Sequence, residues 1–323
     1  MIQTLPHTMT AAVLDHFGGI EKLRIQALPV PEIGPGQVLI RIEATGLGAW
    51  DVEEREGEYV AYLGAPTFPY VLGWEGAGTV VQAGSAVTRF SEGDRVYAVV
   101  FPESGGGGFC AEYAAVNADD VAPVPPSLTM EQAAAMGWDA LTALAGVEGA
   151  LAVAPGETLM VFGASGGVGH LALQIARRAG ARVLAVASGD DGVALVRRLG
   201  ADAAVDGRRH DVLAAAREFA PTGVDAAIVT TGGAAAEAAL AAVRDGGRVA
   251  YPNGVTPRPQ GRPGLRVVSF DGVRTEEAKE RLHHMLAAGE LHVHVAHAFP
   301  LTDIARAHRA LAGHYVGKLV LRG

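Results

Sequence analysis

Short apolar runs separated by turn-forming residues characterise the first third of the chain. The runs occupy residues 38–42, 78–81 and 95–100, and turn signals stand at residues 34–36 and 92–94. Runs of this length, bounded by glycine and proline, are typical of β-strands in an antiparallel sheet. We therefore expect residues 1–124 to form a mostly antiparallel β-domain that ends at a cluster of three prolines.

A different pattern follows that cluster. Ser127 or Thr129 can cap a helix at this point. Beyond it, apolar runs alternate with alanine-rich segments. The runs occupy residues 158–162, 182–186, 225–229, 247–251 and 264–270. This alternation predicts a parallel, doubly wound sheet over residues 125–270. A helix over residues 276–288, a short strand and a last helix then close the chain in residues 271–323.

A glycine-rich turn lies directly between the first apolar run of the second half and a helical pattern. Its sequence is Gly163-Ala164-Ser165-Gly166-Gly167-Val168-Gly169. Glycines let a backbone approach a pyrophosphate without Cβ clashes, and the following helix presents free amides to it. The position between strand and helix predicts a dinucleotide site that includes Ser165, Gly166, Gly167 and Val168.

The end of the second strand of this half indicates which dinucleotide binds. NAD-binding sites carry an acidic residue there that holds the ribose hydroxyls. This strand ends at Ser188 and lacks that acid, whereas Asp190 and Asp191 come later, where we expect helix-capping residues. Ser188 can donate to a 2′-phosphate, and Arg208 or Arg209 can supply charge unless they only line a solvated loop. The pattern favours NADPH over NADH.

Composition and charge narrow the classes of partner. A chain of 323 residues with 49% hydrophobic and 19% charged residues is long enough for two packed domains. A net charge of −9 disfavours nucleic acid and anionic membrane surfaces as partners. The single cysteine, Cys110, excludes an intrachain disulfide and a four-cysteine zinc site. The start of the chain has no signal-peptide pattern, and no apolar stretch is long enough to span a membrane, so we expect a cytoplasmic protein.

Several motifs in the same order resemble the medium-chain dehydrogenase/reductase superfamily, in its zinc-free quinone oxidoreductase (zeta-crystallin-like) branch. They are Gly46-Leu47-Gly48-Ala49-Trp50-Asp51, Gly73-Trp74-Glu75-Gly76-Ala77-Gly78, Glu92-Gly93-Asp94-Arg95-Val96, Gly108-Phe109-Cys110-Ala111-Glu112-Tyr113, the glycine turn, Asp245-Gly246-Gly247-Arg248-Val249 and Gly317-Lys318-Leu319-Val320-Leu321. The resemblance implies an α/β chain in which a Rossmann doubly wound parallel sheet is inserted into a GroES-like β-barrel catalytic domain. It also implies a homodimer.

The same resemblance bears on metal binding. Zinc-dependent relatives carry ligands at positions that match Gly48, Trp74 and Trp138 here, and none of these side chains can ligate zinc. Trp50, Trp74 and Trp138 are the only tryptophans of the chain, and all fall in motifs around that place. We expect these tryptophans either to fill the space that the zinc ion occupies in relatives or to line a pocket for a flat, apolar, conjugated substrate.

A conjugated carbonyl needs less polarisation than a simple ketone, because the hydride it accepts produces a resonance-stabilised enolate or phenolate. Orientation and one or two hydrogen bonds can therefore replace zinc. Tyr59 matches a tyrosine of enoyl-reductase members that contacts the carbonyl, with Tyr62 as a competing candidate. Asp51 matches a carboxylate near the metal site, with either a catalytic role or a local backbone hydrogen bond. The sequence thus favours a quinone or enone reductase.

The resemblance also assigns further residues to the cofactor. Thr142 matches a threonine that contacts the nicotinamide, and Ser269 and Phe270 match a strand end that meets its carboxamide. Asn253 and Lys318 complete this set. Two alternatives to a quinone or enone reductase remain open: an enoyl reductase of a biosynthetic pathway with a carrier-bound substrate, and a non-catalytic NADPH-binding protein.

Two other features carry less weight. His292 and His294 share a face of an expected strand, without an acidic or cysteine partner that would make them a metal site. Cys110 is expected to be a small buried residue, because no positive neighbour that would activate its thiol is evident.

Overall fold

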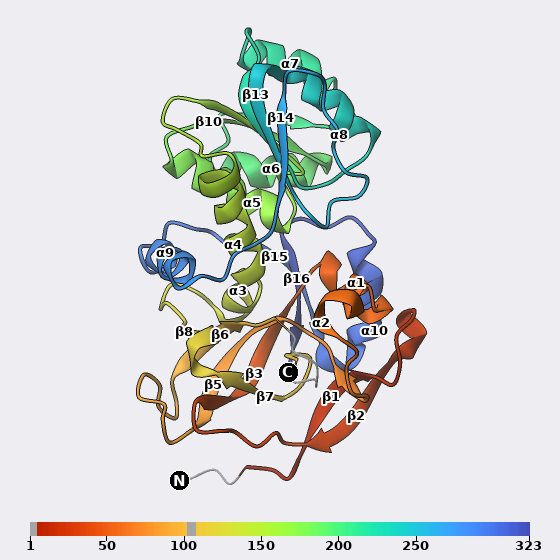
Figure 1. Cartoon of the computed structure of the whole chain (residues 1–323), viewed down its shortest axis with the longest axis vertical. Helices are drawn as coiled ribbons and strands as arrows, with labels where there is room; N and C mark the ends of the chain where they lie inside the picture. The colour runs from red at the N-terminus through yellow and green to blue at the C-terminus, as the bar shows by residue number, and fades with distance from the viewer. Residues whose placement is uncertain (1–4, 102–107) are drawn as a thin grey trace. The chain divides into compact units, whose positions relative to one another are not determined.

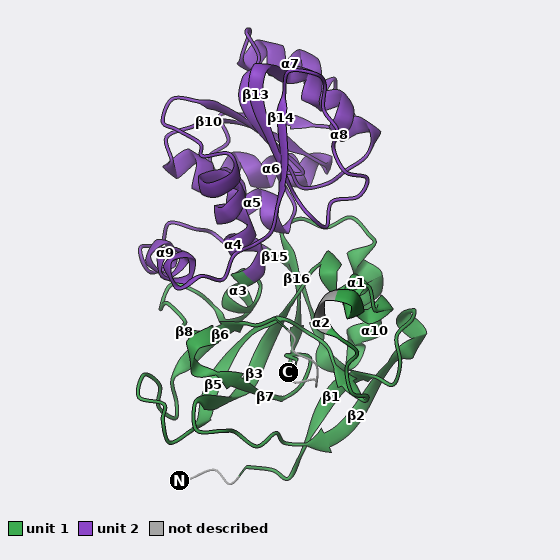
Figure 2. Cartoon of the chain, viewed as in Figure 1, with its two compact units in different colours: residues 1–137, 295–323 green, residues 138–294 purple. Residues whose placement is uncertain are grey.

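The computed structural model describes residues 5–101 and 108–323, which form two compact units (Figure 1). Unit 1 comprises Met1–Gly137 with Val295–Gly323, and unit 2 comprises Trp138–His294 (Figure 2). Both ends of the chain thus belong to one unit and the middle forms the other, as the resemblance implied. The sequence placed the boundaries earlier, after residues 124 and 270. In the described part of the chain, no helix is long and apolar enough to cross a membrane.

Unit 2 is built on a parallel sheet of six strands in the order β11-β10-β9-β12-β13-β14. The strands are β9 (Thr158–Phe162), β10 (Arg182–Ala187), β11 (Ala203–Asp206), β12 (Val224–Val229), β13 (Val243–Pro252) and β14 (Arg266–Phe270). Counted along the chain, this is the order 3-2-1-4-5-6 of a doubly wound dinucleotide-binding sheet, which confirms the predicted fold. The strand order reverses between β9 and β12, and ligands of such sheets bind at the carboxyl ends near that point.

Helices alternate with these strands (Figure 1). They are α4 (Gly137–Leu144), the π-helix η3 (Ala145–Ala150), α5 (Gly167–Arg178), α6 (Gly189–Arg198), α7 (Val212–Phe219), α8 (Ala234–Ala239), the 3-10 helix η4 (Leu240–Ala242) and α9 (Glu276–Ala287). Strand residues such as Met160, Leu184 and Ala227 form the buried core, because parallel strands are covered on both faces. Asp211 and Thr275 cap α7 and α9.

Unit 1 is mostly antiparallel and contains two sheets. One has the order β15-β16-β3-β5-β6-β8, with β7 also paired to β3, and the other has the order β2-β1-β4. The strands are β1 (Thr8–Leu14), β2 (Leu23–Pro29), β3 (Gln37–Leu47), β4 (Tyr70–Val71), β5 (Glu75–Ala83), β6 (Arg95–Val99), β7 (Tyr113–Asn117), β8 (Val121–Pro123), β15 (Val295–Pro300) and β16 (Lys318–Arg322). The C-terminal strand β16 pairs with β3, so the chain end completes the N-terminal sheet.

Short helices connect the strands of unit 1. They are η1 (Ile20–Lys22), α1 (Ala49–Glu56), α2 (Val60–Leu63), η2 (Ala118–Asp120), α3 (Met130–Ala134), η5 (Leu301–Asp303) and α10 (Ile304–Leu311). Of the two candidate caps for α3, Thr129 is the one used, and its hydroxyl accepts a hydrogen bond from the Gln132 amide at 3.2 Å. Ile304 and Ala307 of α10 pack with Leu14 and Phe299 in a core of unit 1.

Candidate active site

Helix α1 carries three charged side chains on its buried face. Asp51, Glu54 and Arg55 lie at positions i, i+3 and i+4, which place them on one side of the helix, and all three are buried. Gly48 is the N-cap residue of the helix, and its backbone N–H donates to Asp51 Oδ2 at 2.6 Å. Gly57, in the left-handed conformation, is the C-cap residue. Because isolated charges are costly to bury, this face must be satisfied by neighbours.

Asp51 is fully buried, and only one of its carboxyl oxygens is accounted for. Oδ2 accepts the Gly48 N–H, whereas Oδ1 has no hydrogen-bond partner among the described residues. Burial and the nearby Glu54 carboxyl raise the pKa of Asp51 well above its usual value. Asp51 therefore makes the local backbone hydrogen bond that was one of its two expected roles. A catalytic role stays a prediction.

Glu54 accepts hydrogen bonds from several directions. Its donors are the Tyr70 hydroxyl and the Gly73 amide, the latter at 3.4 Å from Oε2. Burial raises the pKa of Glu54 to about 7, although the hydrogen bonds from the Tyr70 hydroxyl and the Gly73 N–H oppose that rise. The carboxyl is thus held by donors alone, the pattern that suits its ionised form.

Beside this cluster, a buried ammonium sits against an indole ring. Lys318 Nζ lies 3.0 Å from Glu75 Oε1 and 4.1 Å from the centre of the Trp50 ring. Both members of the ion pair are almost fully buried. The ion pair and the cation–π contact together compensate the two buried charges for their loss of hydration. Lys318, assigned to the cofactor by resemblance, thus has its partners in unit 1, and a cofactor contact stays a prediction.

Three aromatic side chains of unit 1 form a contiguous row. The rings of Tyr59 and Trp74 have centres 4.9 Å apart, and those of Trp74 and Phe101 are 5.1 Å apart. We call Tyr59, Trp74 and Phe101 the aromatic row. Trp74 is buried at its middle, while Phe101 is 38% exposed. Neighbouring rings are tilted by 56° and 44°, so the row is an apolar cluster of which Phe101 is the exposed end.

The hydroxyl of Tyr59 has a defined partner. It donates a hydrogen bond to Glu53 Oε2. Burial and the Glu53 carboxyl raise the pKa of Tyr59, so the phenol keeps its proton over the physiological range. Tyr59 is therefore a hydrogen-bond donor. The side chain of Tyr62, the competing candidate, lies outside the described part of the structure.

The positions that match the zinc ligands of relatives are occupied by residues that cannot bind a metal ion. At Gly48, an added Cβ would lie 2.4 Å from the Trp50 ring, so the indole covers this residue directly. The thiol of Cys110 is buried, and burial raises its pKa well above the usual value, which keeps it protonated. Among the described residues, no group of three or more His, Cys, Asp or Glu side chains is arranged to hold a metal ion.

The glycine turn of unit 2 has the geometry that a pyrophosphate requires. Gly163 adopts a φ of 83°, and an added Cβ would lie 2.3 Å from the Thr230 hydroxyl. At Gly169, an added Cβ would lie 2.1 Å from the Gly163 carbonyl, so only glycine lets α5 approach the end of β9. Gly166 is the N-cap residue of α5, and its side chain provides no cap. The first amides of the helix are therefore left for an anion, and the residues present fit a dinucleotide.

A buried histidine supports the glycine turn through a hydrogen bond. His170 Nδ1 lies 2.9 Å from the Gly166 carbonyl oxygen, and Nε2 accepts the His294 N–H at 3.3 Å. These partners fix the tautomer, because Nε2 accepts and Nδ1 must donate. Burial lowers the pKa of His170 to about 4, so the ring is neutral at physiological pH. Gln174 adds a second link, to the backbone of His292.

The next strand ends hold the groups expected at a 2′-phosphate. Ser188 follows β10 and precedes α6, and its N–H lies 3.4 Å from Ser165 Oγ. Arg209 pairs with Asp190 at 2.9 Å and with Asp206 at 3.5 Å. By contrast, the exposed Arg208 guanidinium has no partner among the described residues, so it is the arginine available to an anion.

The sequence did not indicate a role for Asp206, the carboxylate that contacts the backbone of this arginine. Asp206 ends β11, and Oδ1 accepts the Arg208 N–H at 3.0 Å, which is the main cause of its lowered pKa. The carboxylate thus shapes the loop that presents Arg208. Asp190 and Asp191 do not cap α6 as expected; they lie in its first turn, and Ser188 occupies the N-cap position.

The remaining cofactor candidates of unit 2 gather at the ends of β13 and β14. The backbone N–H of Asn253 donates to the Phe270 carbonyl at 2.9 Å. A Cβ on Gly146 would lie 2.5 Å from the Phe270 ring, and one on Gly272 would lie 2.6 Å from Thr142 Oγ1. The π-helix η3 and helix α4 therefore pack closely against the end of β14. Ser269, in the same strand end, is exposed.

Trp138 belongs to the same corner of unit 2. A Cβ on Gly272 would lie 3.4 Å from its ring, and the Arg274 guanidinium lies 5.7 Å from the ring centre. Of the three tryptophans, Trp50 and Trp74 therefore lie in unit 1 and Trp138 in unit 2. A shared substrate pocket stays a prediction.

Comparisons with known proteins agree with this arrangement. Residues 34–126 match the alcohol dehydrogenase GroES-like domain, and residues 167–261 match the zinc-binding dehydrogenase family. The chain is 32% identical over 329 residues to a chloroplastic NADPH-dependent alkenal/one oxidoreductase of Arabidopsis thaliana, over 98% of this chain and 80% of that protein. It is 31% identical over 332 residues to a quinone oxidoreductase of Sus scrofa, over 97% of both chains.

The chain belongs to the medium-chain dehydrogenase/reductase superfamily. The resemblance to its quinone oxidoreductase branch is thereby confirmed, as is the Rossmann and GroES-like fold. A solved NAD-dependent alcohol dehydrogenase also matches, with a TM-score of 0.89 and 30% identity over 98% of this chain and 100% of that one. This medium-chain dehydrogenase/reductase is thus an oxidoreductase, while its substrate and cofactor require further argument.

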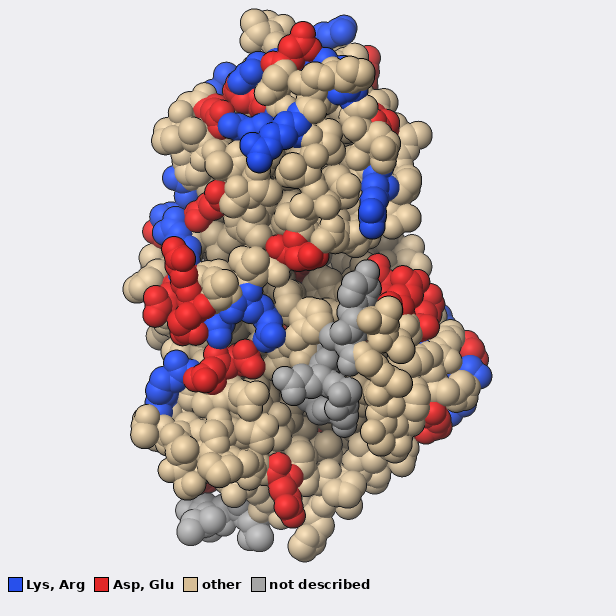
Figure 3. All heavy atoms as spheres, viewed as in Figure 1, with Lys and Arg blue, Asp and Glu red and all other residues tan. Residues whose placement is uncertain are grey.

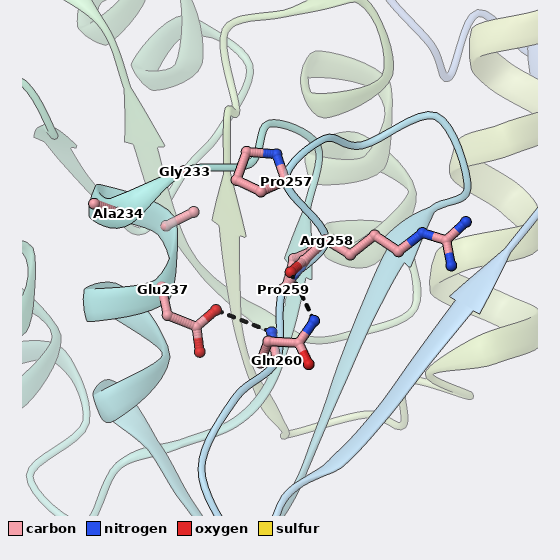
Figure 4. A pocket seen from close by; sticks show the side chains of 8 residues that line it. Gly233, Ala234, Glu237, Pro257, Arg258, Pro259 and Gln260 are labelled. Atoms are coloured by element: carbon pink, nitrogen blue, oxygen red, sulfur yellow. Dashed lines mark hydrogen bonds between the residues drawn. The ribbon is translucent and has the colours of Figure 1, made fainter.

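A surface pocket of this medium-chain dehydrogenase/reductase lies beside the segments that follow β12 and β13 (Figure 4). Its lining consists of Gly233, Ala234, Ala236, Glu237, Pro257, Arg258, Pro259 and Gln260. Glu237 accepts the backbone N–H groups of Gln260 at 3.0 Å and Gly261 at 2.7 Å, and the Arg258 guanidinium points away from it (Figure 4). The carboxylate is thus used to hold the loop.

The surface charge of the protein is mixed on the face shown in Figure 3. Acidic and basic side chains are interspersed there, with wide uncharged areas between them. No large field of one sign covers this face, so it offers no extended basic surface for a nucleic acid.

Sequence reasoning missed several residues of this site. Glu54 stands three residues after Asp51 in a polar segment, and that spacing is the signal that both share a helix face. Asp206 ends a short apolar run that was not singled out. Phe101 follows the run at residues 95–100, and His170 comes directly after the glycine turn; neither carries a recognisable pattern of its own.

Proposed function

We propose that this oxidoreductase transfers a hydride from NADPH to the conjugated position of a quinone or an α,β-unsaturated carbonyl, without zinc. The observation that carries the proposal is the replacement of ligand chemistry in unit 1. Gly48 lies under the Trp50 ring, and Trp74 belongs to the aromatic row, at positions where zinc-dependent relatives carry ligands. A Lewis acid is needed to polarise a simple ketone, whereas a conjugated acceptor stabilises the new charge by resonance.

NADPH, when bound, supplies the hydride. In unit 2, the glycine turn and the amides of α5 would hold its pyrophosphate, while Ser188 and Arg208 would hold the 2′-phosphate. Asn253, Ser269, Phe270 and Thr142 would hold the nicotinamide. The Arabidopsis relative is named as NADPH-dependent, which supports this choice over NADH.

In unit 1, the proposed roles follow from protonation states. Tyr59 keeps its proton, so the phenol can donate a hydrogen bond to the carbonyl oxygen on which negative charge develops. Its present acceptor, Glu53, must then be exchanged for the substrate oxygen. Phe101, the exposed member of the aromatic row, would pack against the planar acceptor. These steps need orientation and one hydrogen bond rather than a metal.

Steady-state oxidation of NADPH tests the proposal. Quinones and enones should be reduced in the presence of a metal chelator, and saturated ketones of the same carbon skeleton should not. Equal rates with saturated ketones, or loss of activity on chelation, would refute it. Turnover confined to a carrier-linked enoyl thioester would favour the biosynthetic enoyl reductase. The expected homodimer and the cytoplasmic location remain predictions, for light scattering and cell fractionation to test.

A further inference from the structure

The turn that follows β13 places an asparagine directly before a glycine. Asn253 and Gly254 are both exposed, and the turn is closed by a hydrogen bond from the Val255 N–H to the Pro252 carbonyl at 2.9 Å. The chain contains one other asparagine, Asn117. The chemical environments of the two asparagines can therefore be compared directly.

The backbone nitrogen of Gly254 is free to react with the side chain before it. The side-chain amide nitrogen of Asn253 donates to Asp271 Oδ2 at 2.7 Å, and its backbone N–H donates to the Phe270 carbonyl at 2.9 Å. By contrast, the Gly254 N–H has no hydrogen-bond partner among the described residues. Glycine also lacks a Cβ that would shield this nitrogen. Nothing in the described turn therefore holds the Gly254 nitrogen away from the carbonyl carbon of the Asn253 side chain.

Asn117 differs in both respects. Its side chain is also exposed, but it precedes Ala118, whose N–H donates to the Gly36 carbonyl at 3.0 Å. The nitrogen after Asn117 is thus engaged in a hydrogen bond and shielded by a methyl group. Exposure is the same at the two asparagines, whereas the freedom of the following nitrogen is not.

We propose that Asn253 is a site of spontaneous deamidation, at which water converts the side-chain amide to a carboxylate and thereby weakens cofactor binding at the end of β13. The Gly254 nitrogen attacks the side-chain carbonyl carbon of Asn253 and forms a new C–N bond. The bond from that carbon to the amide nitrogen breaks, and ammonia leaves with the proton of the Gly254 N–H. Water then opens the resulting five-membered succinimide at either carbonyl, which gives aspartate or isoaspartate. Water is the only co-reactant, because no atom changes its oxidation state.

Both products disturb the end of β13. Oxygen replaces the nitrogen that donates to Asp271, so a hydrogen bond becomes a contact between two carboxylates, which repel each other. Isoaspartate also adds a carbon to the main-chain path and so displaces the turn. Asn253 is one of the residues proposed to hold the nicotinamide, so the effect on the cofactor rests on the proposed function.

Peptide mass spectrometry of the full-length protein, incubated at mildly alkaline pH, tests the site. The peptide that contains Asn253 should gain the mass of deamidation at least several-fold faster than the peptide that contains Asn117. Its product should accept a methyl group from an isoaspartyl methyltransferase. In calorimetric titrations with NADPH, the fraction of protein that binds with the original affinity should fall as the deamidated fraction rises. Equal rates at the two asparagines would overturn the proposal.

Matched variants separate the chemistry from its effect. Gly254 does not adopt a positive φ, so the turn accepts Gly254→Ala. This variant should deamidate at least about tenfold more slowly and bind NADPH, when fresh, within about twofold of the original Kd. An unchanged rate of deamidation would overturn the attack by the Gly254 nitrogen.

A second pair of variants reproduces the product. Asn253→Asp should raise the Kd for NADPH about tenfold from the start, since it loses one hydrogen bond and gains a repulsive charge. Asn117→Asp makes the same change at the other asparagine and should leave the Kd within about twofold. Retention of the original Kd in Asn253→Asp would overturn the effect on the cofactor.

The two proposals fail in different ways. Deamidation is measured by mass on the free protein, so its absence at Asn253 overturns this inference whatever the substrate. If the unchanged protein binds NADPH but reduces no quinone or enone, the proposed function fails, while the rate of deamidation and the Kd of Asn253→Asp still decide the role of Asn253.

Discussion

A substitution at Gly166 allows cofactor binding to be tested without disturbing the fold. The residue has φ −83° and ψ −176°, an extended conformation open to any amino acid. An added Cβ would have its nearest contact at 3.4 Å, to the Gly163 carbonyl oxygen, so the substitution introduces no clash. Aspartate is also a preferred N-cap residue, and we expect Gly166→Asp to stabilise α5 by a few tenths of a kcal/mol.

The same carboxylate should oppose the pyrophosphate of NADPH. Two unit charges about 4 Å apart repel by about 4 kcal/mol at an effective dielectric constant of about 20. If half of this survives relaxation and salt screening, the affinity falls about thirtyfold. The new side chain also uses amides that would otherwise bind phosphate. We therefore expect a protein that is at least as stable as the original and that binds NADPH at least about thirtyfold more weakly.

Calorimetric titration with NADPH, run beside thermal unfolding of the free protein, measures both quantities. Gly166→Asn caps the helix without charge and should give an intermediate affinity, while Gly166→Ala reports the effect of size alone. An NADPH affinity in Gly166→Asp within about threefold of the original would refute the assignment of the glycine turn to the pyrophosphate.

Three further predictions concern single side chains. Tyr59→Phe should lower kcat for enones about tenfold or more and for quinones less, since one hydrogen bond to developing charge is lost; equal turnover in stopped-flow assays would remove Tyr59 from the reaction. Arg208→Ala should raise the KM for NADPH about tenfold and leave that for NADH unchanged, with the exposed Arg217→Ala as control. His170 has a pKa of about 4 when folded and about 6.5 when unfolded, so the unfolded chain binds more protons between these values and stability falls as the pH falls. Between pH 7 and pH 4, the free energy of unfolding measured in urea should therefore fall by about 2–3 kcal/mol less in His170→Gln than in the original protein. An identical fall would contradict a buried neutral ring.

The local parts of this site were predictable because their signals are local. Thr129 was one of two candidate caps for the helix it starts, and the glycine turn stands where strand and helix patterns meet. Ser188 follows a predicted strand, and the carboxyl ends of parallel strands share one edge of a sheet. Each of these depends on a few neighbouring residues.

The rest depends on contacts between distant parts of the chain. Glu54 receives hydrogen bonds from Tyr70 and Gly73, which lie 16 and 19 residues away. His170 meets His294 across 124 residues. The partners of Lys318 were equally hidden, because the pairing of β16 with β3 brings the end of the chain to its beginning. Such pairings follow from the assembled fold rather than from a short pattern.

Deuterium transfer from NADPH labelled at the reactive position of its nicotinamide tests the central claim most directly. With an enone as acceptor, the account predicts a saturated ketone that carries deuterium at the β-carbon, since hydride goes to the conjugated position. Deuterium on the carbonyl carbon of an allylic alcohol would contradict it, because that product requires direct carbonyl reduction of the kind that an alcohol dehydrogenase performs.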